Sequence, residues 1–225
     1  MKNIWIVIPA YNEETKLAEV VQGVFEYATN VVVIDDGSQD RTHEVAKRSG
    51  AWVLRHRINR GQGAALATGI EFALRRGAEV IVTFDSDGQM SAADIPKMIK
   101  PIADGEAEAV LGSRFVEKTV HNMPLLRCLV VKGGIWFTRV LSRIDITDTH
   151  NGFRALSRSA ASQIEIRQDR MVHASEILDQ ISKKKIKFVE RPVTVTYTDY
   201  SMSRDNNSNL NAIYIAARMI FSKLF

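Results

Sequence analysis

Short runs of apolar, mostly β-branched residues recur along the first half of the chain, and polar residues or glycine bound each run. Runs of this length without a helical period are typical of strands that are buried on both faces of a sheet. The sequence therefore predicts strands at residues 4–8, 31–34, 51–54, 80–84 and 109–111.

The segments between these runs carry apolar residues at helical spacing. Residues 17–25, 66–74 and 95–102 repeat apolar side chains every three or four positions, which places them on one face of a helix. Strands that alternate with helices predict an α/β fold with a mostly parallel central sheet flanked by helices on both faces. Ligands of such sheets bind beyond the carboxyl ends of the strands.

Three polar stretches follow predicted strands directly and would line that edge of the sheet. They are "PAYNEE" at 9–14, "DDGSQDRT" at 35–42 and "DSDGQ" at 85–89. Tyr11 and Glu13 can present a ring and a carboxylate, and Asp36 lies in a glycine-containing turn where it can accept hydrogen bonds from a base or a ribose. The alternative is that Asn12 or Glu13, together with Asp40, only caps the following helices.

Asp85 and Asp87 lie two positions apart at the end of a buried strand, and the carboxamide of Gln89 follows. Burying like charges together is costly unless a cation lies between them. Oxygen ligands from these three residues suit Mg²⁺ or Mn²⁺, which keep coordination positions open for phosphates. Such a cation would neutralise the diphosphate that leaves a nucleotide-linked substrate. Because an isolated Asp-x-Asp also occurs in ordinary turns, this prediction depends on the position at the strand end.

Composition restricts the class of protein further. The chain has 225 residues, of which 45% are hydrophobic and 25% charged, and this favours one sizeable globular domain. The net charge of +4 is too small to indicate a nucleic-acid partner. The single cysteine, Cys128, excludes an intramolecular disulfide and fits a reducing compartment, so we expect a cytoplasmic protein. No apolar stretch reaches the length of a spanning helix, so any membrane contact is predicted to be peripheral.

Six motifs occur in a characteristic order: "VIPAYNEE", "VVVIDDGSQDRT", "NRGQGAALATGIEFA", "FDSDGQ", "GSRF" and "THNGFRALSR". As an ordered set they resemble the inverting family 2 glycosyltransferases of GT-A fold. Within that family they are similar to the dolichyl-phosphate mannose synthase and polyprenyl-phosphate glycosyltransferase branch. The resemblance covers roughly residues 3–160.

The resemblance implies one glycosyltransferase domain that uses a nucleotide diphosphate sugar. It implies a nucleotide-sugar-binding half at 1–112, an acceptor-side half at 113–205 and a C-terminal amphipathic helix at 206–225. The residues implied for the nucleoside are Pro9, Tyr11, Glu13, Ile34 and Asp36, and those implied for the metal and diphosphate are Asp85, Ser86, Asp87 and Gln89. Arg114 and Arg127 correspond to arginines that contact phosphate. In the tail the chain departs from the branch pattern, because Tyr200 replaces an arginine, and Arg204 is the candidate substitute.

Proton chemistry leaves alternatives for the acceptor. A polyprenyl phosphate is mostly dianionic at neutral pH, so it can attack the sugar without a protein base. A saccharide hydroxyl, as in surface polysaccharide assembly, would need a carboxylate base, for which Asp148 and Glu176 are candidates; Glu176 also suits a structural place at a helix start. A third alternative is a catalytically silent nucleotide-sugar-binding subunit of a membrane partner, against which the retained Asp85 and Asp87 argue.

Two segments are candidates for membrane contact. Residues 114–143 interleave basic with apolar and aromatic side chains, which suits an anionic lipid headgroup but also an amphipathic helix packed on the sheet. Residues 210–224 carry an apolar stripe at helical spacing. If that stripe is exposed, it would dock on a membrane surface or on an integral membrane subunit.

Several remaining glycines and histidines have structural interpretations. Gly61, Gly63 and Gly69 match a dinucleotide-binding fingerprint only loosely, and close packing of a helix explains them. His150 and His173 lack the spacing of a zinc site and are predicted to be structural or supporting polar groups.

Overall fold

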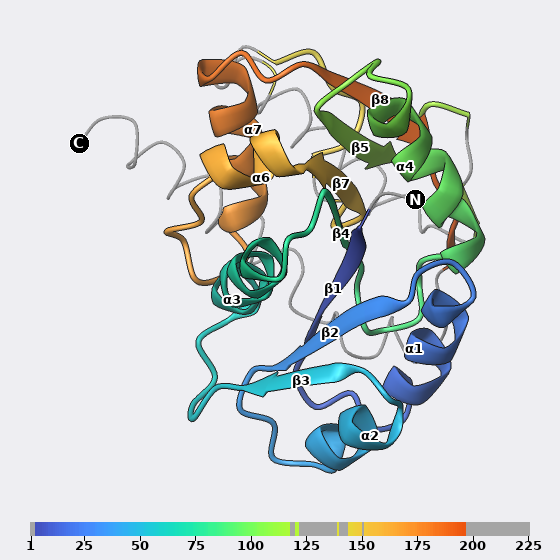
Figure 1. Cartoon of the computed structure of the whole chain (residues 1–225), viewed down its shortest axis with the longest axis vertical. Helices are drawn as coiled ribbons and strands as arrows, with labels where there is room; N and C mark the ends of the chain where they lie inside the picture. The colour runs from blue at the N-terminus through green and yellow to red at the C-terminus, as the bar shows by residue number, and fades with distance from the viewer. Residues whose placement is uncertain (1–2, 118–119, 122–138, 140–143, 150, 197–225) are drawn as a thin grey trace.

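The computed structural model describes residues 3–117, 120–121, 139, 144–149 and 151–196 (Figure 1). Several predictions lie outside these residues. They are the candidate ligands Arg127 and Arg204, the helix at 206–225, His150 and most of the basic segment 114–143.

The core of the molecule is a seven-stranded sheet with the strand order β3-β2-β1-β4-β7-β5-β8. Its strands are β1 (Ile4–Ala10), β2 (Asn30–Asp35), β3 (Trp52–Arg55), β4 (Val80–Thr83), β5 (Ala109–Ser113), β7 (Arg154–Ser157) and β8 (Phe188–Pro192). A second small sheet pairs β6 (Val120–His121) with β9 (Val195–Thr196). Each of the five predicted strands overlaps an observed one, and the large sheet contains strands from both predicted halves of the chain.

The large sheet is parallel except for β7, which runs antiparallel to both of its neighbours, β4 and β5. The start of β7 therefore lies at the carboxyl ends of the other strands. Arg154, the first residue of β7, is the register partner of Thr83 on β4 and of Leu111 on β5. The sequence pattern did not reveal this strand, and its reversed direction brings Arg154 to the edge where ligands of such sheets bind.

Helices cover both faces of the sheet, as predicted (Figure 1). The helices α1 (Leu17–Phe25), α2 (Thr42–Arg48) and α4 (Ile95–Ala103) pack on one face, and α3 (Gln62–Arg75), α6 (Arg158–Gln163) and α7 (His173–Lys183) pack on the other. A short 3₁₀ helix, η1 (Ala92–Asp94), precedes α4. The fold is thus the mostly parallel α/β architecture that the alternating pattern indicates.

Helix α3 lies unusually close to the sheet because a glycine faces it. A Cβ atom on Gly69 would lie 2.5 Å from Ile34 Cδ1 and closer still to Val7 Cγ1. Both of these side chains are fully buried in the layer beneath the helix. The prediction that close helix packing explains this glycine is confirmed, and the approach sets the height of α3 above β1 and β2.

We expect Gly69→Ala to destabilise the protein by about 1 to 3 kcal/mol, because the added methyl group overpacks a filled core. Urea unfolding at neutral pH measures the change. Gly23→Ala in α1 is the matched control, since its Cβ would meet Ala92 Cβ at an ordinary 3.7 Å. The control should be neutral or stabilising by up to about 1 kcal/mol from helix propensity. Equal effects of the two substitutions would contradict the packing argument.

Candidate active site

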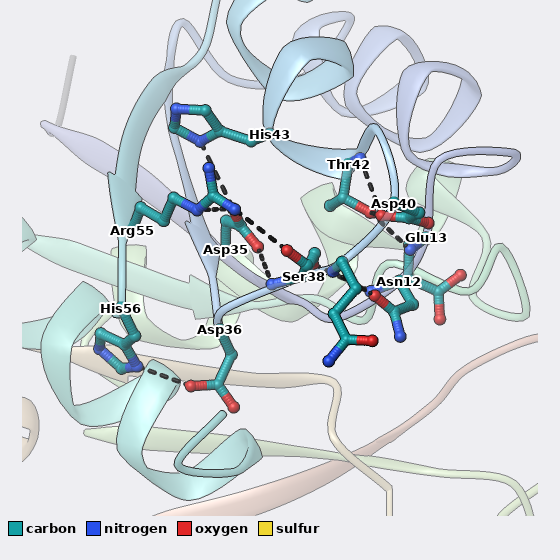
Figure 2. A network of polar contacts seen from close by, with 11 residues as sticks. Asn12, Glu13, Asp35, Asp36, Ser38, Asp40, Thr42, His43, Arg55 and His56 are labelled. Carbon is teal, nitrogen blue, oxygen red and sulfur yellow. Dashed lines mark hydrogen bonds and ion pairs between the residues drawn. The ribbon is translucent and has the colours of Figure 1, made fainter. Parts of the chain in front are cut away.

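The loops that follow β1 and β2 are fastened to each other by side-chain to backbone hydrogen bonds (Figure 2). Asn12 N–H donates to Ser38 Oγ at 3.0 Å, and Gln39 N–H donates back to Asn12 Oδ1 at 2.9 Å. Glu13 N–H donates to Thr42 Oγ1 at 2.7 Å, while the Glu13 carboxylate points away from this contact in Figure 2. The stretches 9–14 and 35–42 therefore form one fixed edge of the site. The Glu13 carboxylate takes no part in the contact between Glu13 N–H and Thr42.

Asp40 belongs to the same network. Its carboxylate accepts hydrogen bonds from Thr42 N–H at 2.9 Å and from Glu14 N–H at 3.2 Å. Although burial raises the pKa of Asp40, the hydrogen bonds from Thr42 and Glu14 outweigh it and hold this pKa below its usual value. The N-cap positions of α1 and α2 are Lys16 and Arg41, and neither makes a side-chain cap. Asp40 thus joins the two loops, whereas the alternative from the sequence was that it only caps a helix.

Asp35 and Asp36 are adjacent but point in different directions (Figure 2). Asp35 is fully buried; its Oδ1 accepts from Ser38 N–H at 2.9 Å, and its Oδ2 lies 3.0 Å from Arg55 Nε. His43 Nδ1 lies 3.4 Å from the same Oδ2. Asp35 therefore anchors the turn and β3 from inside the protein.

Asp36, the predicted nucleoside ligand, faces the opposite way and is 2% exposed. Its Oδ1 accepts from His56 Nδ1 at 2.6 Å and from Arg60 N–H at 3.0 Å, and its Oδ2 accepts from Gly61 N–H at 2.6 Å. Two other residues predicted for the nucleoside differ in exposure. The Tyr11 residue is 36% exposed, whereas the Ile34 side chain is buried beneath α3. Ile34 therefore supports this edge from within the core.

Asp85 is held against β7 and the residues before it. Thr83 Oγ1 donates to Gly152 O at 2.6 Å, and the rings of Phe84 and Phe153 make an edge-to-face contact with centroids 5.1 Å apart. These contacts bring Gly152 so close that a Cβ there would lie 2.7 Å from Asp85 Oδ2 and 2.9 Å from Oδ1. A glycine at position 152 is thus what leaves room for the Asp85 carboxylate.

The neighbouring residues of "DSDGQ" are fixed as well. Ser86 is buried, and its hydroxyl donates to Pro9 O at 2.8 Å, which ties the loop to β1. Gln89 N–H donates to Asp87 Oδ1 at 2.9 Å, and Gln89 O accepts from Thr196 N–H. The loop therefore holds Asp87 from one side through its own backbone.

Burial and two neighbouring acids raise the pKa of Asp85 to about 7. Burial of the carboxylate is the largest cause, followed by the charge of Asp87, and Glu13 adds to it. Arg154 opposes the shift by its positive charge, and Gln62 opposes it through a hydrogen bond from Nε2 to Asp85 Oδ1 at 2.8 Å. Among the described residues, Arg154 and Gln62 therefore offset only part of the effect of burial and of the neighbouring acids on Asp85.

Arg154 is a candidate site residue that the sequence did not reveal. It is buried, Asp85 and Asp148 both act on its charge, and its Nη2 donates to Ala174 O at 3.2 Å. Burial lowers the pKa of Arg154 to about 10, against the opposing effect of the two aspartates, so it stays a cation at neutral pH. The motif "THNGFRALSR" contains this arginine, but only the reversed direction of β7 shows where it lies.

Arg114 and Asp148 form a buried ion pair at the end of β5. Arg114 Nε lies 2.6 Å from Asp148 Oδ2, Nη2 lies 2.7 Å from Oδ1, and Arg114 N–H donates to Oδ2 at 3.1 Å. Both side chains are almost completely buried. Asp148, a candidate base, thus has both carboxylate oxygens engaged by Arg114.

Glu176, the other candidate base, also has a structural task. Its Oε2 accepts from the N–H groups of Arg167 and Gln168, each at 3.0 Å. Glu176 lies in the first turn of α7, so it holds the preceding loop against the start of the helix. This is the structural place at a helix start that its sequence position suggested.

Comparison with known families identifies the chain. Residues 5–164 match the model of Glycosyl transferase family 2. The chain belongs to this family. It is therefore a glycosyltransferase, and the resemblance drawn from the ordered motifs is confirmed.

Named relatives of this glycosyltransferase cover nearly the whole chain. The UDP-N-acetylglucosamine–dolichyl-phosphate N-acetylglucosaminyltransferase of Methanococcus voltae is 35% identical, over 92% of this chain and 90% of the relative. The polyprenol monophosphomannose synthase of Mycolicibacterium smegmatis is 29% identical, over 91% of this chain and 82% of the relative. An uncharacterized protein of Methanocaldococcus jannaschii is 38% identical, over 99% of this chain and 93% of the relative.

Solved structures confirm the GT-A fold of the glycosyltransferase. Glucosyl-3-phosphoglycerate synthase of Mycobacterium tuberculosis, in complex with Mn²⁺, UDP and glucosyl-3-phosphoglycerate, matches with a TM-score of 0.75. The match covers 97% of this chain and 80% of that chain at 18% identity. The same enzyme with Mg²⁺ and UDP matches with a TM-score of 0.69 and 19% identity, over 97% of this chain and 79% of that chain.

The donor set at Asp85 and Asp87 fits a divalent cation that is shared with a substrate. Two neighbouring carboxylates, one of them with a raised pKa, are hard oxygen ligands of the kind that Mg²⁺ and Mn²⁺ prefer. Within the described residues, no group of three or more His, Cys, Asp and Glu side chains is placed to hold a metal ion. A cation here would therefore need further ligands, and the phosphates of a bound nucleotide can provide them.

His173, at the start of α7, is buried beside the site. Its Nδ1 lies 2.8 Å from Arg170 O. Burial, aided by the charge of Arg154, lowers the pKa of His173 to about 4, although the hydrogen bond to Arg170 opposes the change. His173 is therefore neutral in the folded protein at physiological pH, as a structural histidine would be.

We expect Gly152→Ala to weaken Mn²⁺ binding in the presence of UDP by about tenfold or more, because the new methyl group displaces the Asp85 carboxylate. Isothermal titration calorimetry measures the change. Gly23→Ala is the matched control and should bind Mn²⁺ like the parent. A Gly152→Ala protein that folds and binds Mn²⁺ as tightly as the parent would refute the role of this contact.

The buried, neutral His173 predicts a dependence of stability on pH. Because its folded pKa of about 4 is below the ordinary 6.5, the unfolded chain binds a proton first as pH falls. This contribution to stability is complete above pH 6.5 and is lost progressively toward pH 4, by about 3 kcal/mol. His173→Asn keeps an N–H donor but does not titrate, so urea unfolding should show a shallower decline over this range. Identical declines for parent and variant would contradict the prediction.

Proposed function

We propose that the protein is a metal-dependent, inverting hexosyltransferase that moves a sugar from a nucleotide diphosphate sugar onto polyprenyl phosphate. The observation that carries the proposal is the carboxylate pair at the end of β4, which suits a metal-bound diphosphate. The names of two relatives describe the same kind of sugar transfer. These relatives act, by their names, on dolichyl phosphate or make a polyprenol monophosphosugar, and each match covers more than nine tenths of this chain.

Both candidate bases already make hydrogen bonds within the protein, and this supports a phosphate acceptor. Asp148 is paired with Arg114, and Glu176 holds the backbone of the loop before α7. A saccharide hydroxyl needs a carboxylate that is available to accept its proton. A phosphate oxygen needs none, because the phosphate monoester is already ionised at neutral pH. The described site therefore suits the acceptor that requires no proton transfer.

The donor would lie along the edge formed by the ends of β1, β2 and β4. Tyr11, Glu13 and Asp36 would contact the nucleoside, together with Pro9, and Ile34 would support them from the core. Asp85, Asp87 and Gln89 would hold Mg²⁺ or Mn²⁺, and Ser86 would fix their loop to β1. Arg127 and Arg204 are proposed phosphate contacts that lie outside the described residues.

The acceptor oxygen would form a bond to the anomeric carbon while the bond from that carbon to the diphosphate oxygen breaks. A bound divalent cation would supply Lewis-acid stabilisation of the departing nucleotide diphosphate. Asp85 and Asp87 would orient the diphosphate end of the donor, and the loop contacts to β1 and β7 would keep these carboxylates in place. Arg114, oriented by Asp148, would present positive charge toward the same edge.

A lipid acceptor implies work at a membrane surface. No helix in the described part of the chain is both long and apolar enough to cross a bilayer. We therefore propose peripheral contact, with the basic segment 114–143 and the stripe at 210–224 as its candidate elements. Contact with an integral membrane subunit and a place on the cytoplasmic face are further parts of this proposal.

We expect Asp85→Asn and Asp87→Asn each to lower the rate of transfer to polyprenyl phosphate by about a hundredfold or more, because stabilisation of the leaving diphosphate is lost. A radiolabelled-sugar assay with several nucleotide sugars measures the rate, and EDTA should reduce the parent to a similar level. Asp104→Asn, at an exposed carboxylate paired with Lys100, is the control and should retain parental activity.

The same assay separates the acceptors. Transfer to oligosaccharides and not to polyprenyl phosphate, with a pH profile that requires one ionised base, would refute the lipid-phosphate proposal. Full activity of both variants in the presence of EDTA would refute the metal proposal. Donor binding without turnover on any acceptor would instead indicate a silent binding subunit.

A further inference from the structure

The carboxylate of Asp36 has nearly all of its hydrogen-bonding capacity filled by the protein. An ionised carboxylate offers about four acceptor directions, two on each oxygen. Oδ1 accepts from His56 Nδ1 and Arg60 N–H, and Oδ2 accepts from Gly61 N–H. One direction, on Oδ2, is left for a ligand, and the 2% exposure of the residue agrees with a single point of contact.

His56 is held in place from its other side. Its Nε2 lies 3.0 Å from Thr68 Oγ1 on α3, and Thr68 Oγ1 lies 3.0 Å from Ala64 O in the same helix. The His56 side chain is 12% exposed. Because an ionised Asp36 can only accept, Nδ1 of His56 must carry the hydrogen that it donates. His56 is thus a fixed donor and cannot turn away to free the Asp36 oxygen.

The backbone donors are equally fixed. Gly37 has a φ of +74°, and a Cβ there would lie 2.7 Å from Ile58 C and 2.8 Å from Asn59 N. The loop that carries Arg60 and Gly61 therefore packs directly on the turn that carries Asp36. A shift of this loop away from Asp36 would leave a buried carboxylate with unsatisfied acceptors, which is costly.

We propose that His56 is a specificity-determining, positioning residue of the nucleoside subsite, because it restricts Asp36 to one acceptor direction. A base that presents a single N–H, as uracil does at N3, matches one direction. Guanine presents two parallel donors, N1–H and the exocyclic amine, and needs two acceptors at once. The donor is therefore a sugar linked to the diphosphate of uridine or thymidine and not of guanosine, and this assignment rests on the proposed placement of the nucleoside at Asp36.

The energetic basis is the penalty for an unpaired polar group. A guanine amine that enters a buried site without an acceptor loses its hydrogen bond to water and gains none in return. Sites that leave a ligand group unpaired in this way discriminate strongly between otherwise similar ligands. With His56 removed, Asp36 would regain an acceptor direction on Oδ1 and could accommodate both guanine donors.

Isothermal titration calorimetry with UDP and GDP, each with Mg²⁺, tests the proposal in the full-length protein. We expect the parent to bind UDP at least about tenfold more tightly than GDP. In His56→Leu, which removes the donor but keeps an apolar side chain, the ratio should fall below about threefold. His56→Asn, which can place an amide N–H where Nδ1 lies, should restore the preference for UDP.

His43→Leu is the matched control. His43 is also mostly buried, with its Nδ1 directed at an aspartate, but that aspartate is Asp35 on the other face of the sheet. The His43→Leu variant should be less stable than the parent, but its ratio of UDP to GDP affinity should be unchanged. If His56→Leu does not fold, Thr68→Val, which removes the contact to Nε2, should lower the same ratio to a lesser degree.

Three results would overturn the proposal. The first is a parent that binds GDP as tightly as UDP, and the second is a folded His56→Leu, or in its absence Thr68→Val, with an unchanged ratio of affinities. An equal change in His43→Leu would also overturn it, because the effect would then be a general one of buried histidines. Calorimetry needs no acceptor, so failure of the acceptor proposal would appear separately, as missing transfer to polyprenyl phosphate despite nucleotide binding.

Discussion

The candidate active site depends on the attraction between the opposite charges of Arg154, at the start of β7, and Asp85, just after β4. Asp87 and Glu13 both act on Asp85 at the carboxyl ends of the strands, where like charges raise each other's free energy. A strand inserted in the reversed direction is what brings a buried cation to this edge, since Arg154 is the first residue of β7 and the register partner of Thr83. A fully parallel sheet would have placed the start of that strand, and its arginine, at the far edge.

Arg154 balances the charge of Asp85 only in part, because two aspartates share its positive charge. Asp148 also acts on it, and Asp148 is itself paired with Arg114, so the charges alternate only from Asp85 through Arg154 and Asp148 to Arg114, while Asp87 adds a second negative charge beside Asp85. Burial, and after it the charges of Asp87 and Glu13, raise the pKa of Asp85 despite the opposing charge of Arg154, so two ionised carboxylates are costly at this end of the series. Excess negative charge on hard oxygen ligands favours a divalent cation, and a cation in turn favours a diphosphate. One electrostatic arrangement therefore links the fold to both proposed ligands.

The sequence predicted strands, helices and the acids at the sheet edge, but not the residues that contact those acids. Buried strands and amphipathic helices follow from local periodicity, and acids such as Asp36 and Asp85 lie directly after the strands, so the sheet edge could be located. Arg154, Gln62 and His56 could not be assigned, because each acts on an aspartate at least 20 positions away and only strand order and direction set that distance. Local pattern carries no information on the direction of a strand such as β7. The engagement of Asp148 and Glu176 was equally hidden, since their partners are defined by tertiary contacts.

Asp35 and Asp36 show how one strand gives adjacent, identical side chains different tasks. Successive residues of a strand point to opposite faces of the sheet. Asp35 turns toward α2 and the guanidinium of Arg55, whereas Asp36 turns toward α3 and the loop at Arg60. The first carboxylate is fully enclosed and can only hold the turn, while the second keeps one acceptor direction. The same turn carries both aspartates, and the hydrogen bond from Ser38 N–H to Asp35 holds the turn from which the Asp36 side chain extends.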